Sequence, residues 1–372
     1  MTMPRIRNSD RVGWLVFAMV VATAALADEP AKWLERMNNA LTTHNYDGTF
    51  THWHGGRVET LRIIHRVKDG VVSERLVSLD GSGREFIRTG SNLTCYLPDK
   101  RTVLVERQPA DQSLFGNFPT LNDQTASVYE IKEVERMRLN RRDTHVIVVS
   151  PKDEFRYGYR LWIDERTALP QKTQLCDARG HVIEQIVFSE LAQTSHIPDI
   201  AFKPDVSTDG FQWLRNETPV GKEPAASASI VWNALKLPPG FKMRAHSAQV
   251  LPGSTDPVDH VVFTDGMASV SVFVETRPKP AAGQPQTVEE ETATVGSSSA
   301  YSTVSNGRKV TAVGEVPPAT VRFIANSVRA QGGQSTGGAA PSLGNTPAPS
   351  MPSSITGGGG APQPVMGGGG RR

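Results

Sequence analysis

The chain has 372 residues, of which 40 are Lys or Arg and 38 are Asp or Glu, so its formal net charge is only +2. A balance this close to neutral excludes the broad basic surface that nucleic-acid binding requires, and we predict no nucleic-acid partner. The length exceeds that of one typical domain and predicts more than one.

The first 27 residues have the organisation of a secretory signal peptide. Three arginines precede the apolar run VGWLVFAMVVATAALA, which ends in an Ala-Leu-Ala motif at Ala27. A basic segment, an apolar segment and small residues at the cleavage point are the three parts of such a leader. The run is shorter than the ~20 residues that span a bilayer, which disfavours a retained membrane anchor. Removing residues 1–27 leaves 37 basic and 37 acidic residues, so the exported chain is neutral.

One amphipathic helix and a long series of strands follow the leader. In EPAKWLERMNNALTTHNY, Trp33, Met37, Ala40 and Leu41 recur at helical spacing and form one apolar face. Most later connections are short and contain Gly, Asp or Asn, which is typical of antiparallel hairpins. The loop-rich passage FGNFPTLNDQTASV interrupts the series. The strand-like segments are GTFTHWH, VETLRIIHRV, GVVSERLVSL, REFIR, NLTCYL, RTVLVERQ, YEIKEVERMRL, THVIVVSP, FRYGYRLWID, LPQKTQLCD and HVIEQIVFSEL.

The excess of strands over helices predicts an α+β fold with a large, open, curved sheet. One helix and a loop-rich insert near residues 110–128 cannot cover so many strands fully, so the sheet is expected to curl into an incompletely closed half-barrel with an apolar concave side. Such a cavity is by default a binding site, here for a lipid or a peptide. The alternative is that the same side chains only pack the core under the helix. Period-two alternation selects as candidate lining residues Leu61, Ile63, Tyr157, Tyr159, Leu161, Ile186 and Phe188.

Four of the nine histidines lie in HNYDGTFTHWHGGRVETLRIIHRV, residues 44–67. His52 and His54 share a strand face, and His65 lies on the returning strand. However, no Cys or carboxylate has a matching ligand spacing, and the chain has no H-E-x-x-H motif. We therefore interpret these histidines as part of a β-hairpin and predict neither a metal site nor a cofactor.

Two further sets of residues are candidates for specific contacts. The arginines around the turn RLNRRD are Arg136, Arg138, Arg141 and Arg142. They are expected either to form a solvated hairpin tip beside Glu133 and Glu135 or to contact an anionic ligand. Separately, Cys95 and Cys176 are the only cysteines. A disulfide between them would close a long loop and contribute roughly 4–5 kcal/mol, and the sequence leaves open whether it forms.

Composition divides the exported chain into two folded units and a tail. We predict a large domain over residues 28–215, a linker over 216–228, a small α+β domain over 229–330 and a disordered Gly/Pro/Ser-rich tail over 331–372. In the small domain, DHVVFTDGMASVSVFVE predicts a hairpin, PAAGQPQTVEEETATVGSSSA a long mobile loop, KVTAVGEV a strand and PPATVRFIANSVR a helix opened by proline. Neither unit contains a catalytic constellation, so we predict that the protein is not an enzyme.

The ordered set of segments WLERMNNA, NYDGTF, ERLVSLDGSGREFIR, FRYGYRLWIDERTALPQKTQL, PPGF, DGMASVSVFVE and VGEVPPATV resembles the sigma-E factor regulatory proteins of the RseB/MucB family. These segments cover most of residues 30–329, and the Gly-rich tail departs from the family pattern. The resemblance implies a large domain similar to the lipoprotein carrier LolA, an open barrel with helices at its mouth.

The resemblance also implies a function. Family members are periplasmic negative regulators that bind the periplasmic domain of the anti-sigma factor RseA or MucA and shield it from the first protease of the stress cascade, DegS. Lipopolysaccharide or another lipid relieves this inhibition, and members associate as homodimers. The alternative is a LolA-like periplasmic carrier of lipids or lipoproteins, but a carrier would need only the large domain.

Overall fold

The computed structural model describes residues 29–107, 113–115, 118, 123–216, 231–250, 257–276 and 290–331. The predicted signal peptide, nearly all of the predicted linker and nearly all of the predicted tail lie outside these residues. None of the helices in the described ranges is both long and apolar enough to cross a membrane.

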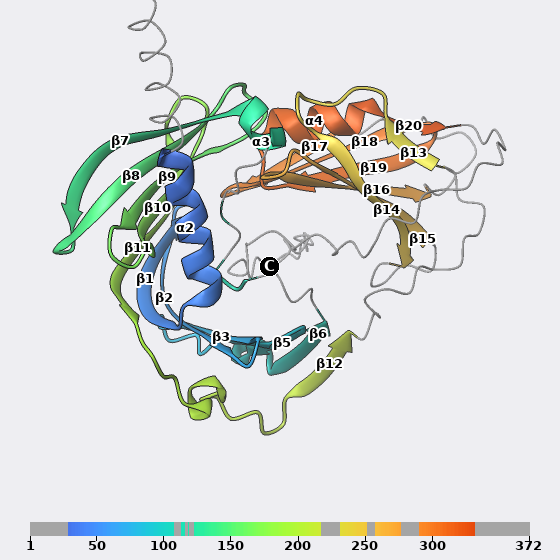
Figure 1. Cartoon of the computed structure of the whole chain (residues 1–372). Coiled ribbons are helices and arrows are strands. Elements are labelled where there is room, and N and C mark those ends of the chain that lie inside the picture. Colours follow the sequence, from blue (N-terminus) through green and yellow to red (C-terminus); the bar gives the residue numbers. More distant parts are fainter. Residues whose placement is uncertain are drawn as a thin grey trace, which may run out of the picture.

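A twelve-stranded sheet forms the larger part of the molecule and curves strongly (Figure 1). Its strand order is β12-β6-β5-β4-β3-β2-β1-β11-β10-β9-β8-β7. All neighbours pair antiparallel except β12, which runs parallel to β6. The strands are β1 Tyr46–His54, β2 Arg57–Lys68, β3 Val71–Ser78, β4 Glu85–Thr89, β5 Asn92–Leu97, β6 Thr102–Arg107, β7 Tyr129–Leu139, β8 Arg142–Pro151, β9 Gly158–Asp164, β10 Pro170–Cys176, β11 Val182–Gln193 and β12 Gln212–Asn216.

The order of these strands follows from short hairpins and one long-range pairing. Between β1 and β2, Gly55 and Gly56 have φ values of 53° and 77°, the left-handed conformation that two-residue hairpin loops favour. The first strand, β1, also pairs with the last long strand, β11, so that Phe50 lies opposite Phe188. This pairing joins two runs of hairpins into one continuous sheet that bends around its inner face.

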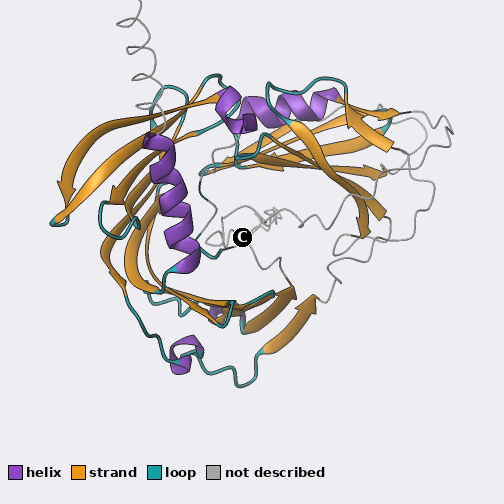
Figure 2. Ribbon diagram, viewed as in Figure 1, coloured by secondary structure: helices purple, strands orange, loops and turns teal. Residues whose placement is uncertain are grey.

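Helix α2 (Glu29–Thr43) lies along the inside of this curve (Figures 1 and 2). The predicted apolar face is confirmed for Trp33, Met37 and Ala40, which are buried, while Leu41 is half-buried against the same core. Leu34 also lies on the buried face. The ring of Trp33 stacks on that of His145 from β8, with 3.8 Å between the centroids. One helix therefore covers part of the concave side, as the strand-to-helix ratio predicts.

The smaller domain is built on a second sheet of six strands, in the order β14-β15-β16-β19-β18-β17. Helix α4 (Pro318–Ser327) covers one face of this sheet and buries Val321, Ile324 and Ala325. The strands are β14 Lys242–Val250, β15 Pro257–Thr264, β16 Ser269–Thr276, β17 Glu291–Val295, β18 Ser298–Ser305 and β19 Arg308–Gly314, and a separate ribbon pairs β13 Val231–Ala234 with β20 Val328–Gln331.

The fold class is confirmed: a large open antiparallel sheet with few helices and a smaller sheet domain. Two predictions of loops are wrong. Residues 291–300, predicted as part of a long loop, form β17 and the start of β18, because Ala293 and Thr294 pair with Ala300 and Ser299. The end of the passage predicted as loop-rich forms the short helix α3 (Asp123–Val128). The remaining short elements are the 3-10 helices η1 (Pro98–Lys100) and η2 (Asp199–Phe202).

Candidate functional site

The centre of the concave face is an aromatic cluster. Phe50 from β1 and Phe188 from β11 lie with their ring centroids 5.2 Å apart. Phe115, from the chain between β6 and α3, lies 5.5 Å from Phe50 and 5.3 Å from Phe188. Leu114 is buried in the same core. The side chains of the inner face thus meet residues from a segment that pattern analysis assigned to a loop.

The structure brings most of the predicted lining residues together at this place. Leu61, Ile63, Leu161 and Phe188 belong to one buried core, and the half-buried Tyr159 and Ile186 pack against it. Tyr157 is buried but lies outside this cluster. In the conformation described, these side chains are packed, as the alternative interpretation required. Their contact with a lipid or a peptide stays a prediction.

A row of polar side chains borders the aromatic cluster on the inner face. Register places Tyr46, His65, Glu74 and Arg88 side by side across β1, β2, β3 and β4. Glu74 is completely buried and accepts a hydrogen bond from Arg88 Nε at 3.0 Å. It also accepts bonds from Ser113 Oγ and the Leu114 backbone N–H, both at 2.7 Å. Burial and the Glu74 carboxylate raise the pKa of Tyr46, whose ring stacks on His65.

His65 is held in this row by a defined hydrogen bond. Its Nδ1–H donates to the His44 carbonyl at 2.9 Å, and its Nε2 lies 3.8 Å from Glu74. Burial lowers the pKa of His65, and the Glu74 charge offsets only part of that effect. His65 is therefore protonated only at a lower pH in the folded chain than in the unfolded chain, where the ordinary histidine pKa is about 6.5.

We expect this difference to make the protein less stable in mild acid. As pH falls through the unfolded-state value, the unfolded chain gains a proton and the free energy of unfolding decreases, until the pH passes the lower folded pKa of His65. One such proton accounts for a slope of at most about 1.4 kcal/mol per pH unit. Urea unfolding of the His65→Gln variant at pH 7.5 and 5.5 should show a smaller difference than the parent. The exposed His196→Gln control should keep the parental difference, and an equal difference in both variants would contradict this role.

The paired histidines lie at the edge of the concave face that meets the small domain. His52 Nε2–H donates to Glu184 Oε1 at 2.5 Å, and the rings of His52 and His54 stack at 4.5 Å. Burial works against ionisation of Glu184, but its hydrogen bonds to His52 and to Ser297, between β17 and β18, lower its pKa. Within the ranges given above, no group of three or more His, Cys, Asp or Glu side chains is arranged to hold a metal ion.

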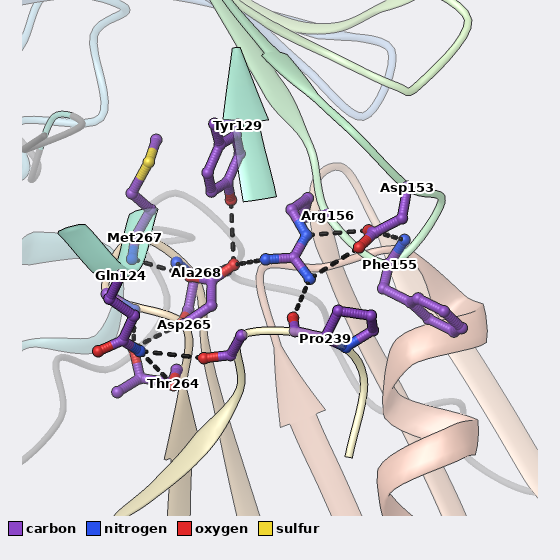
Figure 3. Close-up of polar contacts among 12 residues, drawn as sticks. Gln124, Tyr129, Asp153, Phe155, Arg156, Pro239, Thr264, Asp265, Met267 and Ala268 are labelled. Carbon is purple, nitrogen blue, oxygen red and sulfur yellow. Dashed lines mark hydrogen bonds and ion pairs between the residues drawn. The ribbon is translucent and has the colours of Figure 1, made fainter. Parts of the chain in front are cut away.

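A buried ion pair joins the two domains (Figure 3). Arg156 lies just before β9, Asp265 lies in the turn between β15 and β16, and both side chains are 0% exposed. The Arg156 guanidinium donates to Asp265 Oδ2, to both Asp153 carboxylate oxygens and to the Pro239 carbonyl. Each of the three nitrogens of this buried cation thus donates to an acceptor, as a charge removed from water requires.

Asp265 is equally well satisfied (Figure 3). Its Oδ2 also accepts from the Tyr129 hydroxyl at 3.2 Å, and its Oδ1 accepts from the backbone N–H groups of Met267 and Ala268 at 2.8 and 2.7 Å. Burial and the Asp265 charge raise the pKa of Tyr129, so the hydroxyl stays a donor. We call Tyr129, Asp153, Arg156 and Asp265 the junction cluster.

Further contacts lie beside the junction cluster. Gln124 Nε2 of α3 donates to the Gly240 carbonyl at 3.0 Å. The Thr320 hydroxyl of α4 donates to the Phe155 carbonyl at 2.7 Å, and the ring of Phe155 packs edge-on against Phe323 at 5.4 Å. Met267 of the small domain packs against the core of the large one. Sequence reasoning missed this junction, because FRYGYRLWID was predicted as one strand and Arg156 was not among the candidate contact residues.

The predicted arginine cluster lies at the β7–β8 turn. Three of its members are exposed, and the fourth is held by contacts within the large domain. Arg136 and Arg138 are exposed beside Glu133 and Asp143, at 2.9 and 4.0 Å, and Arg141 is exposed in the turn. Arg142 is held by Asp164 at 3.0 Å and by the Leu191 carbonyl at 2.9 Å. The structure thus brings the four arginines to one hairpin tip, and contact with an anionic ligand stays a prediction.

The possible disulfide is not formed. Cys95 lies in β5 and Cys176 in β10, with β4, β3, β2, β1 and β11 between them in the sheet, and both are free thiols. Burial raises the pKa of Cys95 to about 12. The reason is geometric, since a disulfide requires Cα atoms within about 7 Å and adjacent strands are already separated by about 4.8 Å.

Comparisons with known proteins agree on one family. The family model of the MucB/RseB N-terminal domain matches residues 29–206, and that of the MucB/RseB C-terminal domain matches residues 226–329. The sigma factor AlgU regulatory protein MucB of Pseudomonas aeruginosa is 31% identical over 317 residues, which are 85% of this chain and 95% of that protein. The sigma-E factor regulatory protein RseB of Salmonella typhimurium is 28% identical over 325 residues, covering 85% of this chain and 97% of that protein.

Solved structures give the same match in three dimensions. The MucA/MucB complex of Pseudomonas aeruginosa contains a chain that superposes with a TM-score of 0.63 at 27% identity, covering 82% of this chain and 100% of that one. A second structure, of MucB with the periplasmic part of MucA, scores 0.62 with 81% and 99% coverage. A crystal structure of MucB has a TM-score of 0.52, covering 82% of this chain and 98% of that one.

Proposed function

Because the chain belongs to the MucB/RseB family, we propose that it binds the periplasmic segment of an anti-sigma factor and thereby restrains a sigma-E-type envelope stress response. The protein acts by binding rather than by catalysis. The leader-like residues 1–27 support export to the periplasm, where such a partner segment lies.

One observation carries this proposal. The chain superposes on two structures of MucB with MucA with TM-scores of 0.63 and 0.62, against 0.52 for a crystal structure of MucB, at the same 27% identity. In the present structure the junction cluster and the Phe155–Phe323 contact hold the two domains together. This docked arrangement supports a mode in which both domains present one surface to the partner.

Binding to both domains explains how the partner would be shielded. A protease needs an accessible, extended stretch of chain, and a segment bound to two docked domains is released only when both contacts open. Linking two contacts in one molecule raises the overall affinity well above that of either contact alone. The small domain is thus essential to this function, whereas a LolA-like carrier would not require it.

A lipid would relieve the inhibition by binding to the concave face of the large domain. Burying twelve acyl methylenes contributes roughly 10 kcal/mol before ordering costs. Only the part of this energy that differs between the partner-bound and partner-free states changes partner binding, about tenfold for each 1.4 kcal/mol. The acyl chain of lipopolysaccharide is the ligand class that this face suits by its aromatic and aliphatic side chains.

A protease-protection assay tests the proposal. The anti-sigma factor's periplasmic domain is incubated with its first protease, with and without the full exported chain, and the cleavage rate is followed. We expect at least roughly tenfold slower cleavage at saturating chain, and restored cleavage when lipopolysaccharide is added. Each domain alone, checked for folding by circular dichroism, should protect far less. Unchanged cleavage with the full chain would refute partner binding. If lipopolysaccharide leaves the protection intact, only the proposed relief by lipid is refuted, and partner binding stands.

A further inference from the structure

Residues 113–115 occupy the position on the concave face where an acyl chain would bind. The Phe115 ring packs against both Phe50 and Phe188, and Leu114 is buried in the same core. Neither residue belongs to a strand of the sheet or to helix α2. The apolar centre of the concave face is therefore filled by a separate segment of the same chain.

The polar end of this segment is held by one buried carboxylate. Glu74 accepts hydrogen bonds from Ser113 Oγ and from the Leu114 N–H, both at 2.7 Å, while Ser113 Oγ also accepts from the Phe115 N–H at 3.1 Å. Glu74 also forms an ion pair with Arg88, whose Nε lies 3.0 Å from Glu74 Oε2. The segment thus presents a hydroxyl, an amide N–H and an apolar group in a row.

We propose that residues 113–115 are an internal competitor of the lipid ligand, and that the ligand replacing them carries a hydroxyl or amide donor beside its acyl chain. This inference rests on the lipid binding described under the proposed function and names the chemistry of that ligand. Without such a donor, Glu74 would lose two hydrogen bonds inside a buried site, and an unsatisfied buried acceptor disfavours binding.

The same chemistry occurs in two kinds of ligand. A 3-hydroxyacyl chain carries a hydroxyl two carbons from its carbonyl, and an N-acylated peptide carries an amide N–H at the end of its acyl chain. A plain fatty acid of the same length carries neither group next to its chain. Comparison of these three probes separates the contribution of the apolar chain from that of the donor.

Binding of a fluorescent fatty acid to the full exported chain, and its displacement by these three probes, tests the proposal. We expect the 3-hydroxy fatty acid, the N-acyl peptide or both to bind at least about fivefold more tightly than the plain fatty acid, the factor that one hydrogen bond contributes. Whichever of these two probes binds more tightly identifies the kind of ligand that supplies the donor. Equal affinity of all three probes would overturn the donor requirement.

Two variants test the competition. Phe115→Ala removes the ring that fills the cluster and should tighten binding of the fluorescent fatty acid roughly tenfold. Ser113→Ala removes one donor to Glu74 with a smaller change in packing and should tighten it about fivefold. The matched control Phe273→Ala, on β16 of the small domain, should leave the affinity unchanged. Parental affinity in both test variants, with folding confirmed by circular dichroism, would overturn the competition.

The same proteins distinguish this inference from the proposed function. Capture of the anti-sigma factor's periplasmic segment is measured without lipid for the parent and for Phe115→Ala. If the parent captures the segment but neither variant changes fatty-acid binding, the competitor is refuted and the proposed function stands. If the variants bind fatty acid more tightly but the parent captures no segment, the competitor stands and the proposed function is refuted.

Discussion

Replacing Asp265 by alanine is expected to lower the free energy of unfolding by about 3–5 kcal/mol and to separate the two domains. The substitution leaves the Arg156 guanidinium fully buried with only Asp153 and a carbonyl as acceptors, and it removes the acceptor of the Tyr129 hydroxyl. Urea unfolding measures the stability. If the docked domains form the binding surface, affinity for the anti-sigma factor's periplasmic segment should fall by roughly a hundredfold or more.

Two further proteins make this prediction specific. In the exposed ion pair of Asp143 with Arg138, at 4.0 Å, the Asp143→Ala control should change stability by less than about 1 kcal/mol. The double variant Arg156→Met with Asp265→Leu should be more stable than Asp265→Ala, because it removes both buried charges. A double variant that is as unstable as the single one would show that charge burial is not the cause.

Replacing Trp33 by alanine is expected to destabilise the large domain by about 3–5 kcal/mol, the usual range for a buried Trp. Trp33 joins α2 to the concave face through its stack on His145, and the Arg36 guanidinium lies 3.9 Å above its ring centroid. Because α2 covers the inner side of the sheet, its loosening should also expose apolar surface. Urea unfolding and the fluorescence of a bound hydrophobic dye measure the two effects.

The same helix provides the control for this substitution. Lys32 precedes Trp33 but is exposed, and its ion pair with Glu29 spans 3.0 Å at the surface. Lys32→Ala should change stability by less than about 0.5 kcal/mol and leave dye binding at the parental level. Equal losses in the two variants would mean that the contact of Trp33 with the sheet is not what stabilises α2.

Local patterns were sufficient to predict the elements whose apolar residues recur at regular spacing. The helix face of Trp33 and Met37 and the hairpin at Gly55–Gly56 were predicted because helical spacing, alternation and turn chemistry act within a few residues. Short polar segments were harder to predict: ETATV forms β17 with all five residues exposed, and this strand is defined by its pairing with β18. Nothing in its own pattern distinguishes it from a loop.

The candidate site shows the same limit: the faces of its strand residues were predicted, but their distant partners were not. Leu61, Ile63 and Phe188 were assigned to the concave face because alternation decides the face on which a strand residue lies. The partners of that face were not predicted, since Phe115 comes from a passage without periodicity and reaches Phe50 across 65 positions of the chain. The role of Arg156 was missed because the predicted strand FRYGYRLWID was extended three residues too far; β9 begins at Gly158, so Arg156 lies before it.

The order of residues alone thus determined most strands of the large sheet, the apolar face of its first helix and the resemblance to one family. The tertiary structure alone decided that Arg156 meets Asp265 across 109 positions, that His52 pairs with Glu184, and that Cys95 and Cys176 lie too many strands apart to bond. Spacing and propensity are short-range properties that each segment carries in itself. The burial of a charge or of an aromatic ring depends on which distant segments the folded sheet brings against it, and that is settled only when the whole chain is packed.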